Sequence, residues 1–166
     1  MTVRVVDGEG MKQLEALLNG LSNPNLVGKV GWFEKNKYPG ENPIPVAYVA
    51  TIQEYGYPPG NIPARPFLRP TIIEKQAEWQ QAVLYLAKGM LRGTENQYSV
   101  LDKIGMIARG NIQEKIASIF SPPLSPRTIQ ARLSRKSDKK TIGALTKPLI
   151  DTGIMIGSVT NVVEVA

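Results

Sequence analysis

Two long helical patterns stand next to each other in the sequence, and they limit the possible folds more than any other feature. In residues 70–91, apolar side chains recur at intervals of seven, four, three and four residues, which keeps them on one face of a helix. These side chains are Ile72, Trp79, Val83, Leu86 and Met90. A second helix is expected from about residue 99, with an apolar face of Leu101, Ile104, Ala108, Ile112, Ile116 and Ile119. We expect these two helices to pack together and the first to be the longest core element.

Shorter segments predict a small sheet beside the helices. Residues 2–6 and 158–165 alternate apolar with polar side chains, and residues 26–33 are rich in strand-forming residues. A chain of 166 residues is about the size of one ordinary domain. The predicted fold class is therefore α+β, with residues 1–166 forming a single domain in which a small antiparallel sheet packs against two long helices.

Glycine and proline are frequent in the rest of the chain. Together they number 28, which indicates extended Pro/Gly-rich loops rather than a pure helix bundle. Residues 57–63 contain three prolines and are expected not to be helical, whereas Pro70 suits the first turn of the long helix. Ser125 and Pro126 supply a cap and a first-turn proline for a shorter helix. Further short helices are expected at 14–21 and 46–55.

The sequence lacks the residues that most enzymes and metal sites use. It contains no cysteine and no histidine, which removes thiolate chemistry, the commonest general base near neutral pH and the commonest zinc ligand. No run approaches the ~20 apolar residues of a membrane span. We therefore expect a protein that is not an enzyme, uses no cofactor or metal and does not enter a membrane.

The net charge of +6 is concentrated in the second half of the chain. Residues 91–166 hold 11 Lys and Arg against 6 Asp and Glu. Six basic residues crowd one short stretch, namely Arg127, Arg132, Arg135, Lys136, Lys139 and Lys140. Such a stretch attracts phosphate or an acidic partner in a salt-dependent way. The alternative interpretation is a solvated mobile loop, for which residues 134–142 are the best candidate.

Residues Asp151-Thr152-Gly153 look like the active-site triplet of retroviral-type aspartic proteases. In that family two such carboxylates share one proton across a dimer. The triplet stands near the beginning of the protease domain, however, and here only 13 residues follow Gly153. The simpler interpretation is structural, with Asp151 or Thr152 capping a short helix that begins near Gly153.

Several segments, taken in order, resemble the neck and tail-completion proteins of long-tailed bacteriophages. In the first half they are Gly31-Trp32-Phe33, Val46-Ala47, Gln53-Glu54-Tyr55-Gly56 and the run from Ile62 to Pro70. In the second half they are Ser125 to Arg132, Lys147 to Gly153 and Ser158-Val159. The similarity spans nearly the whole chain, and the ordered combination is more specific than any one piece.

The resemblance implies a structural virion protein at the head–tail junction. Such a protein completes the tail and joins it to the head connector, as a hexamer-like ring of identical subunits around the DNA channel. Its partners would be the connector and the tail-tube or tail-terminator proteins, and it would be made and assembled in the bacterial host cytoplasm. A free-standing nucleic-acid-binding module is the alternative, because it also accounts for the basic charge.

Five residues are candidates for contact with neighbouring subunits. Arg65, Phe67 and Arg69 lie on a proline-stiffened segment, which loses little entropy on docking. Tyr55 and Tyr57 flank Gly/Pro loops, and aromatic residues are favoured at interfaces. The basic stretch would face DNA in the channel or an acidic neighbour. In the alternative interpretation, Phe67 fills the protein's own core and both arginines extend their charged ends toward solvent.

Overall fold

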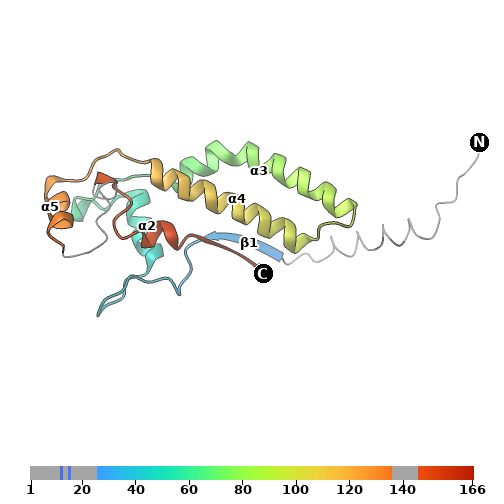
Figure 1. The fold of residues 1–166 in the computed structure, drawn as a ribbon, viewed down its shortest axis with the longest axis horizontal. Helices are drawn as coiled ribbons and strands as arrows, with labels where there is room; N and C mark the ends of the chain where they lie inside the picture. Colours follow the sequence, from blue (N-terminus) through green and yellow to red (C-terminus); the bar gives the residue numbers. More distant parts are fainter. Residues whose placement is uncertain (1–11, 13–14, 16–25, 136–145) are drawn as a thin grey trace, which may run out of the picture.

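Two long helices and a two-stranded sheet form the body of the molecule (Figure 1). The structure is a computed structural model that describes residues 12, 15, 26–135 and 146–166. Helix α3 spans Leu68–Leu91, and helix α4 spans Gln97–Ser118. Strands β1 and β2 span Leu26–Gly31 and Thr160–Val165. The predicted strand at 2–6 and the leucines of the predicted helix at 14–21 lie outside the described residues.

Helix α4 lies between α3 and the sheet (Figure 1). The two strands run antiparallel, with Leu26 opposite Val165 and Gly31 opposite Thr160. Both strands contact α4, whose other side is covered by α3. The α+β prediction is confirmed, including the small antiparallel sheet and the two long helices that pack together.

The start of α4 follows from its own sequence. Asn96 accepts a hydrogen bond from the backbone N–H of Ser99 at 2.8 Å, and the Ser99 hydroxyl accepts one from the N–H of Asn96 at 3.0 Å. This reciprocal arrangement satisfies two amides that a helix start leaves without partners. It explains why α4 begins two residues before the position that its apolar pattern indicates. The turn before it uses Gly93, which adopts a φ of 72° that favours glycine.

Four shorter elements complete the described fold. They are α2 (Val46–Tyr55), the 3-10 turn η1 (Pro58–Gly60), α5 (Pro126–Ser134) and α7 (Ile154–Gly157). The predicted cap at Ser125 is confirmed, since its side chain accepts from the N–H of Thr128. The expectation that 57–63 contains no helical residues is wrong for η1. Two prolines begin this turn, where the missing N–H groups would have had no helical partner.

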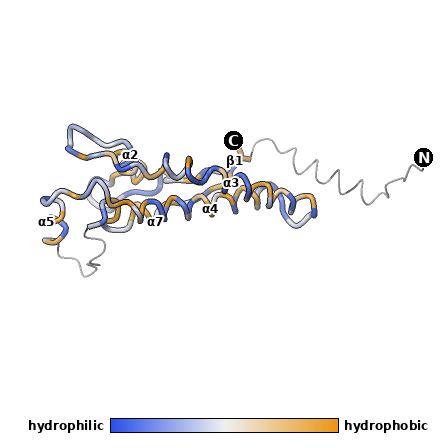
Figure 2. The backbone as a smooth tube through the Cα atoms, turned by 90° about the horizontal axis from the view of Figure 1, so that it is seen from above, coloured by the Kyte–Doolittle hydropathy of each residue, from blue (hydrophilic) through white to orange (hydrophobic). Residues whose placement is uncertain are grey.

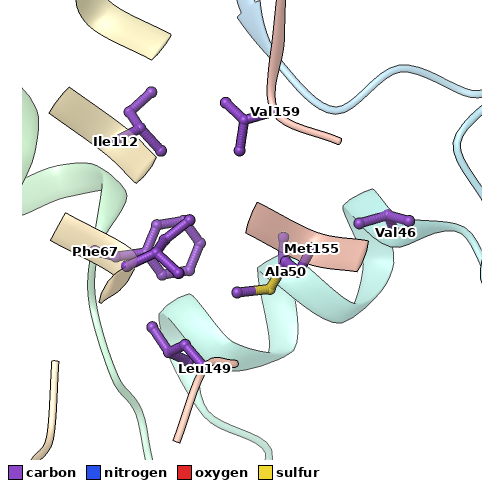
Figure 3. Packing of buried hydrophobic residues seen from close by; sticks show 8 residues of the cluster. Val46, Ala50, Phe67, Ile112, Leu149, Met155 and Val159 are labelled. Atoms are coloured by element: carbon purple, nitrogen blue, oxygen red, sulfur yellow. The ribbon is translucent and has the colours of Figure 1, made fainter. Parts of the chain in front are cut away.

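The core lies at the end of the α3–α4 pair where α2 and α7 meet α4 (Figure 3). Its buried side chains come from α2, α4, α7 and the segments beside them, and they are Val46, Ala50, Phe67, Ile112, Ile116, Leu149, Met155 and Val159. Helix α3 is the longest described helix, as predicted, but the expectation that it is a main part of the core is wrong. Only Thr71 of α3 is buried, and Ile72 and Val83 stay more than two-fifths exposed, because α3 has α4 as its one extensive neighbour among the described elements.

Gly105 allows α4 to approach the sheet closely. A Cβ atom at this position would lie 2.8 Å from the Cβ of Asn161 in β2, which is closer than side-chain carbons approach. Asn161 is itself held in place, because its amide donates to the Asp102 carboxylate at 2.6 Å. The close contact therefore joins α4 to β2 at a point where no side chain fits.

We expect Gly105→Ala to destabilise the protein, although replacing a helical glycine by alanine usually stabilises by about 0.5–1 kcal/mol. The added methyl group must displace Asn161 and its hydrogen bond. Gly110→Ala in the same helix is the matched control, because nothing lies within 4 Å of a Cβ there. Urea unfolding of both variants measures the free energy of unfolding. Equal stabilisation by the two substitutions would contradict the close contact.

Candidate functional site

A buried carboxylate holds the N-terminus of α3. Glu54, in the last turn of α2, is 3% exposed. Its Oε2 atom accepts from the backbone N–H of Phe67 at 2.7 Å and of Leu68 at 2.8 Å. Its Oε1 atom accepts from the N–H of Arg69 at 3.1 Å and from the Arg69 guanidinium at 2.9 Å. The side chain of α2 thus caps a helix that has no cap from its own first residues.

The protonation of Glu54 follows from these contacts. Burial by itself raises the pKa of this carboxyl, but the hydrogen bonds from Leu68, Phe67 and Arg69 outweigh burial and hold the pKa below its ordinary value. The positive end of the α3 dipole acts in the same direction. Glu54 is therefore ionised near neutral pH. No role was predicted for Glu54 from the sequence, and the signal that points to it is the lack of a Ser, Thr, Asp or Asn cap before α3.

Arg65 and Phe67 are part of the protein's interior. The Arg65 guanidinium donates to the carbonyls of Pro122 at 2.7 Å and Pro123 at 3.0 Å, and the residue is 4% exposed. Phe67 is 1% exposed and meets the Trp32 ring edge to face, with ring centres 5.6 Å apart. The prediction that these two side chains contact a neighbouring subunit is corrected, because both are already buried by contacts within the chain. Phe67 instead fills the protein's own core, as the alternative interpretation of the sequence has it.

The other predicted contact residues lie at the surface of the same region. The Arg69 side chain is half exposed and lies over the Tyr55 ring, 4.6 Å from its centre. Tyr55 is 62% exposed and Tyr57 is 44% exposed. Tyr57 pairs with Ile62 through backbone hydrogen bonds that close the η1 loop. These three side chains remain available to a neighbour, and their role at an interface stays a prediction.

Arg132 is a structural residue rather than a surface cation. It is 8% exposed, and its guanidinium donates to the carbonyls of Lys147 at 2.9 Å and Ile150 at 3.0 Å. The prediction that Arg132 faces DNA or an acidic partner is corrected, because these carbonyls occupy its donors. Of the other basic candidates, Arg127 is exposed and Arg135 pairs with Asp151. The remaining candidates lie outside the described residues, namely Lys136, Lys139 and Lys140.

Asp151 lies at a surface pocket of about 430 Å³ between α2, α5 and the turn before α7. Its carboxylate is 2.8 Å from the Arg135 guanidinium and 3.5 Å from the Nε atom of Arg132. Asp151 therefore does not cap α7 as predicted. Thr152 makes only a long contact of 3.4 Å with the N–H of Ile154, and the capping position is Gly153. A carboxylate held by two arginines differs from a pair of carboxylates that shares a proton.

The part of the chain that the structure describes holds no group of His, Cys, Asp and Glu side chains suited to a metal ion. None of its helices is both long and apolar enough to cross a membrane. Comparison with models of protein families, with curated proteins and with solved structures found no match.

Removing the charge of Glu54 should lower the urea concentration at which the protein unfolds. We expect Glu54→Gln to lower the free energy of unfolding at pH 7 by about 2–3 kcal/mol, since hydrogen bonds to a charged group are lost at a buried site. Because folding lowers the pKa of Glu54, its contribution is complete above the ordinary value of 4.5 and is lost as the pH falls below it. The difference between parent and variant should therefore shrink on acidification.

Glu78→Gln is the control for Glu54→Gln, because it removes the same charge from an exposed pair with Lys75. Such a pair contributes only about 0.5 kcal/mol. Urea unfolding followed from pH 7 to pH 3 measures both variants. A Glu54→Gln variant as stable as the control at pH 7 would refute the cap.

The two arginines of α5 are expected to differ in their effect on stability. Arg132→Gln should cost about 1–3 kcal/mol, because buried carbonyls lose their donors. Arg127→Gln, at an exposed position of the same helix, should change the free energy of unfolding by less than about 0.5 kcal/mol. Thermal and urea unfolding compare them. Equal effects would show that burial of Arg132 does not matter.

Proposed function

We propose that this chain is a structural subunit of a tailed bacteriophage that joins the tail to the head connector. It acts by assembly rather than catalysis and forms a ring of identical subunits around the DNA channel. Its partners are the connector on one side and the tail-tube or tail-terminator protein on the other. The proposal rests on the ordered sequence segments that resemble neck and tail-completion proteins.

One observation on the fold supports this proposal most directly. The segments that carry the resemblance contact each other. Glu54, from the 53–56 segment, binds the backbone of residues 67–69. Arg132, at the end of the 125–132 segment, binds the carbonyls of the 147–153 segment. Two pairs of these segments, whose contacting residues stand 13 to 18 positions apart in the chain, are therefore joined by hydrogen bonds from a side chain to the backbone.

The surface beside this unit suits contact with a neighbouring subunit. Tyr48 and Tyr55, both on α2, are 57% and 62% exposed, and Tyr57 follows on the next loop. Exposed tyrosines offer large contact area with few rotatable bonds and are common at the centre of interfaces. Arg69 adds a half-exposed cation over the Tyr55 ring. We assign this tyrosine surface, defined as Tyr48, Tyr55, Tyr57 and Arg69, to the contact within the ring.

Loss of the protein should leave heads and tails unjoined. In cells infected by a phage whose gene for this chain carries a stop codon, we expect filled heads and complete-looking tails to accumulate separately. Electron microscopy of lysates counts them, and supplying the chain from a plasmid should restore joined particles. Normal joined particles without the protein would refute the proposal. Particles that lack tails altogether would instead place the chain in tail synthesis.

Tyr55→Ala tests the tyrosine surface within the same complementation assay. The variant should fold with parental stability and restore fewer infectious particles, by tenfold or more, because an interface aromatic contributes about 2 kcal/mol. Tyr98→Ala is the matched control, since Tyr98 is 54% exposed at the far end of the helix pair. Equal yields with both variants would remove Tyr55 from the interface.

A further inference from the structure

One side of α3 is exposed and uncharged along nearly its whole length. Ile73, Leu84 and Leu91 are 76%, 65% and 67% exposed. With the small and amide side chains between them they form what we call the α3 strip, which consists of Ile73, Ala77, Gln80, Leu84, Ala87 and Leu91. The intervals alternate between four and three residues, which is the spacing of the contact seam in paired helices.

The α3 strip is large enough to receive another helix. From residue 73 to residue 91 it runs about 27 Å along the helix axis. Beside it lies a hollow of about 500 Å³, lined by Gln76, Trp79, Gln80, Val83 and Leu84. The Trp79 side chain is fixed there, because its indole N–H donates to Asn111 of α4 at 2.8 Å. Figure 1 shows α3 at the outer edge of the described fold, and Figure 2 shows apolar residues recurring along it.

From either end the strip begins with a large apolar residue followed by alanine, and its central pair is Gln80 and Leu84. If a second α3 lies antiparallel on the first, Ile73 faces Leu91, Ala77 faces Ala87 and Gln80 faces Leu84. Each of these pairs then occurs twice around a two-fold axis near residue 82. Small residues face small residues at the two Ala77–Ala87 layers, which lie between the outer Ile–Leu layers and the central Gln80–Leu84 layers. Leu84 of the second copy lies over Gln80, at the hollow beside Trp79.

Charges beside the strip favour the same arrangement. Glu74 and Lys88 each follow a strip residue, so both lie on the same flank of α3. In the antiparallel pair, Glu74 of one copy faces Lys88 of the other, and the contact occurs twice. In a parallel pair in register, Glu74 of one copy does not meet Lys88 of the other, because the two positions lie about 21 Å apart along the helix axis. Charges flanking such a seam set the partner and the orientation of paired helices.

We propose that α3 is a self-association surface, on which the α3 strip of a second copy of this chain binds antiparallel about a two-fold axis. A contact of this kind closes at two copies and does not by itself build a ring. It uses a different surface from the tyrosine surface. The inference therefore does not depend on the proposed phage function, and it is tested on the purified full chain alone.

Sedimentation equilibrium over a range of protein concentrations tests the surface. The parent should form a dimer at the higher concentrations, and Leu84→Lys should weaken the dimer at least tenfold by placing a charge in the seam. Tyr85→Lys is the matched control, since Tyr85 is 77% exposed but lies about 100° around the helix from Leu84, outside the α3 strip, and it should dimerise as the parent does. A parent that stays monomeric, or a dimer unaffected by Leu84→Lys, would overturn the proposal.

Charge reversal tests the orientation. Glu74→Lys and Lys88→Glu should each weaken the dimer, because like charges then face each other twice. An equal mixture of the two variants should regain dimers, since every facing pair is again of opposite sign. Glu74 also binds Lys115 within the chain, so Lys88→Glu is the cleaner of the two single variants. A mixture that dimerises no better than the single variants would overturn the antiparallel arrangement.

Thiol crosslinking gives an independent measurement, because the chain contains no cysteine. Gln81→Cys places a thiol next to the two-fold axis, so two copies should be joined by a short bis-maleimide. Ala77→Cys also places a thiol on this side of α3. In the antiparallel pair, however, residue 77 of one copy faces Ala87 of the other, so the two copies of residue 77 lie about 15 Å apart along the helix axis. It should not crosslink to itself. Efficient crosslinking of Ala77→Cys and not of Gln81→Cys would overturn the proposal in favour of parallel helices.

Discussion

The amides at the start of α3 have no acceptor in their own segment, and the carboxylate of Glu54 supplies one from α2. This interaction fixes the residue at which α3 begins and the direction of α3 relative to α2. It also orients the residues between the two helices, so that Phe67 enters the core and Arg65 reaches the carbonyls of Pro122 and Pro123. Those carbonyls follow α4, so the same contact links α2, α3 and the segment after α4.

The periodic pattern of apolar residues predicted the long helices well but not their surroundings. The intervals in residues 70–91 place Ile72 and Val83 on one side of a helix, and that much is a property of the local sequence. Whether a second layer covers that side depends on the position of other elements. The structure has α4 on one side of α3 and leaves these two residues more than two-fifths exposed. Such a periodic pattern shows that one side of the helix is apolar. It does not show whether the protein's own core or a partner covers that side.

The roles of the arginines were harder to predict, for a different reason. Arg65 and Arg132 satisfy their donors with backbone carbonyls from distant parts of the chain. Every residue has a carbonyl, so no residue type in the sequence marks such a partner. Exposed cations such as Arg127 and buried ones such as Arg132 look alike in a basic stretch. Glu54 was equally hidden, since three of its partners are backbone amides and only the Arg69 guanidinium is a charged side chain.

The sheet brings together segments from nearly opposite ends of the chain. Lys29 of β1 pairs with Glu164 of β2, which stands 135 positions later in the chain, whereas α3 and α4 are joined by a short turn. During synthesis on the ribosome, β1 emerges before the helix pair, and β2, its partner among the described residues, follows only after residue 159 has been made. Closing so long a loop costs conformational entropy, whereas α3 and α4 are neighbours in the sequence. We therefore expect α4 to be in place as a surface for both strands before the strands meet.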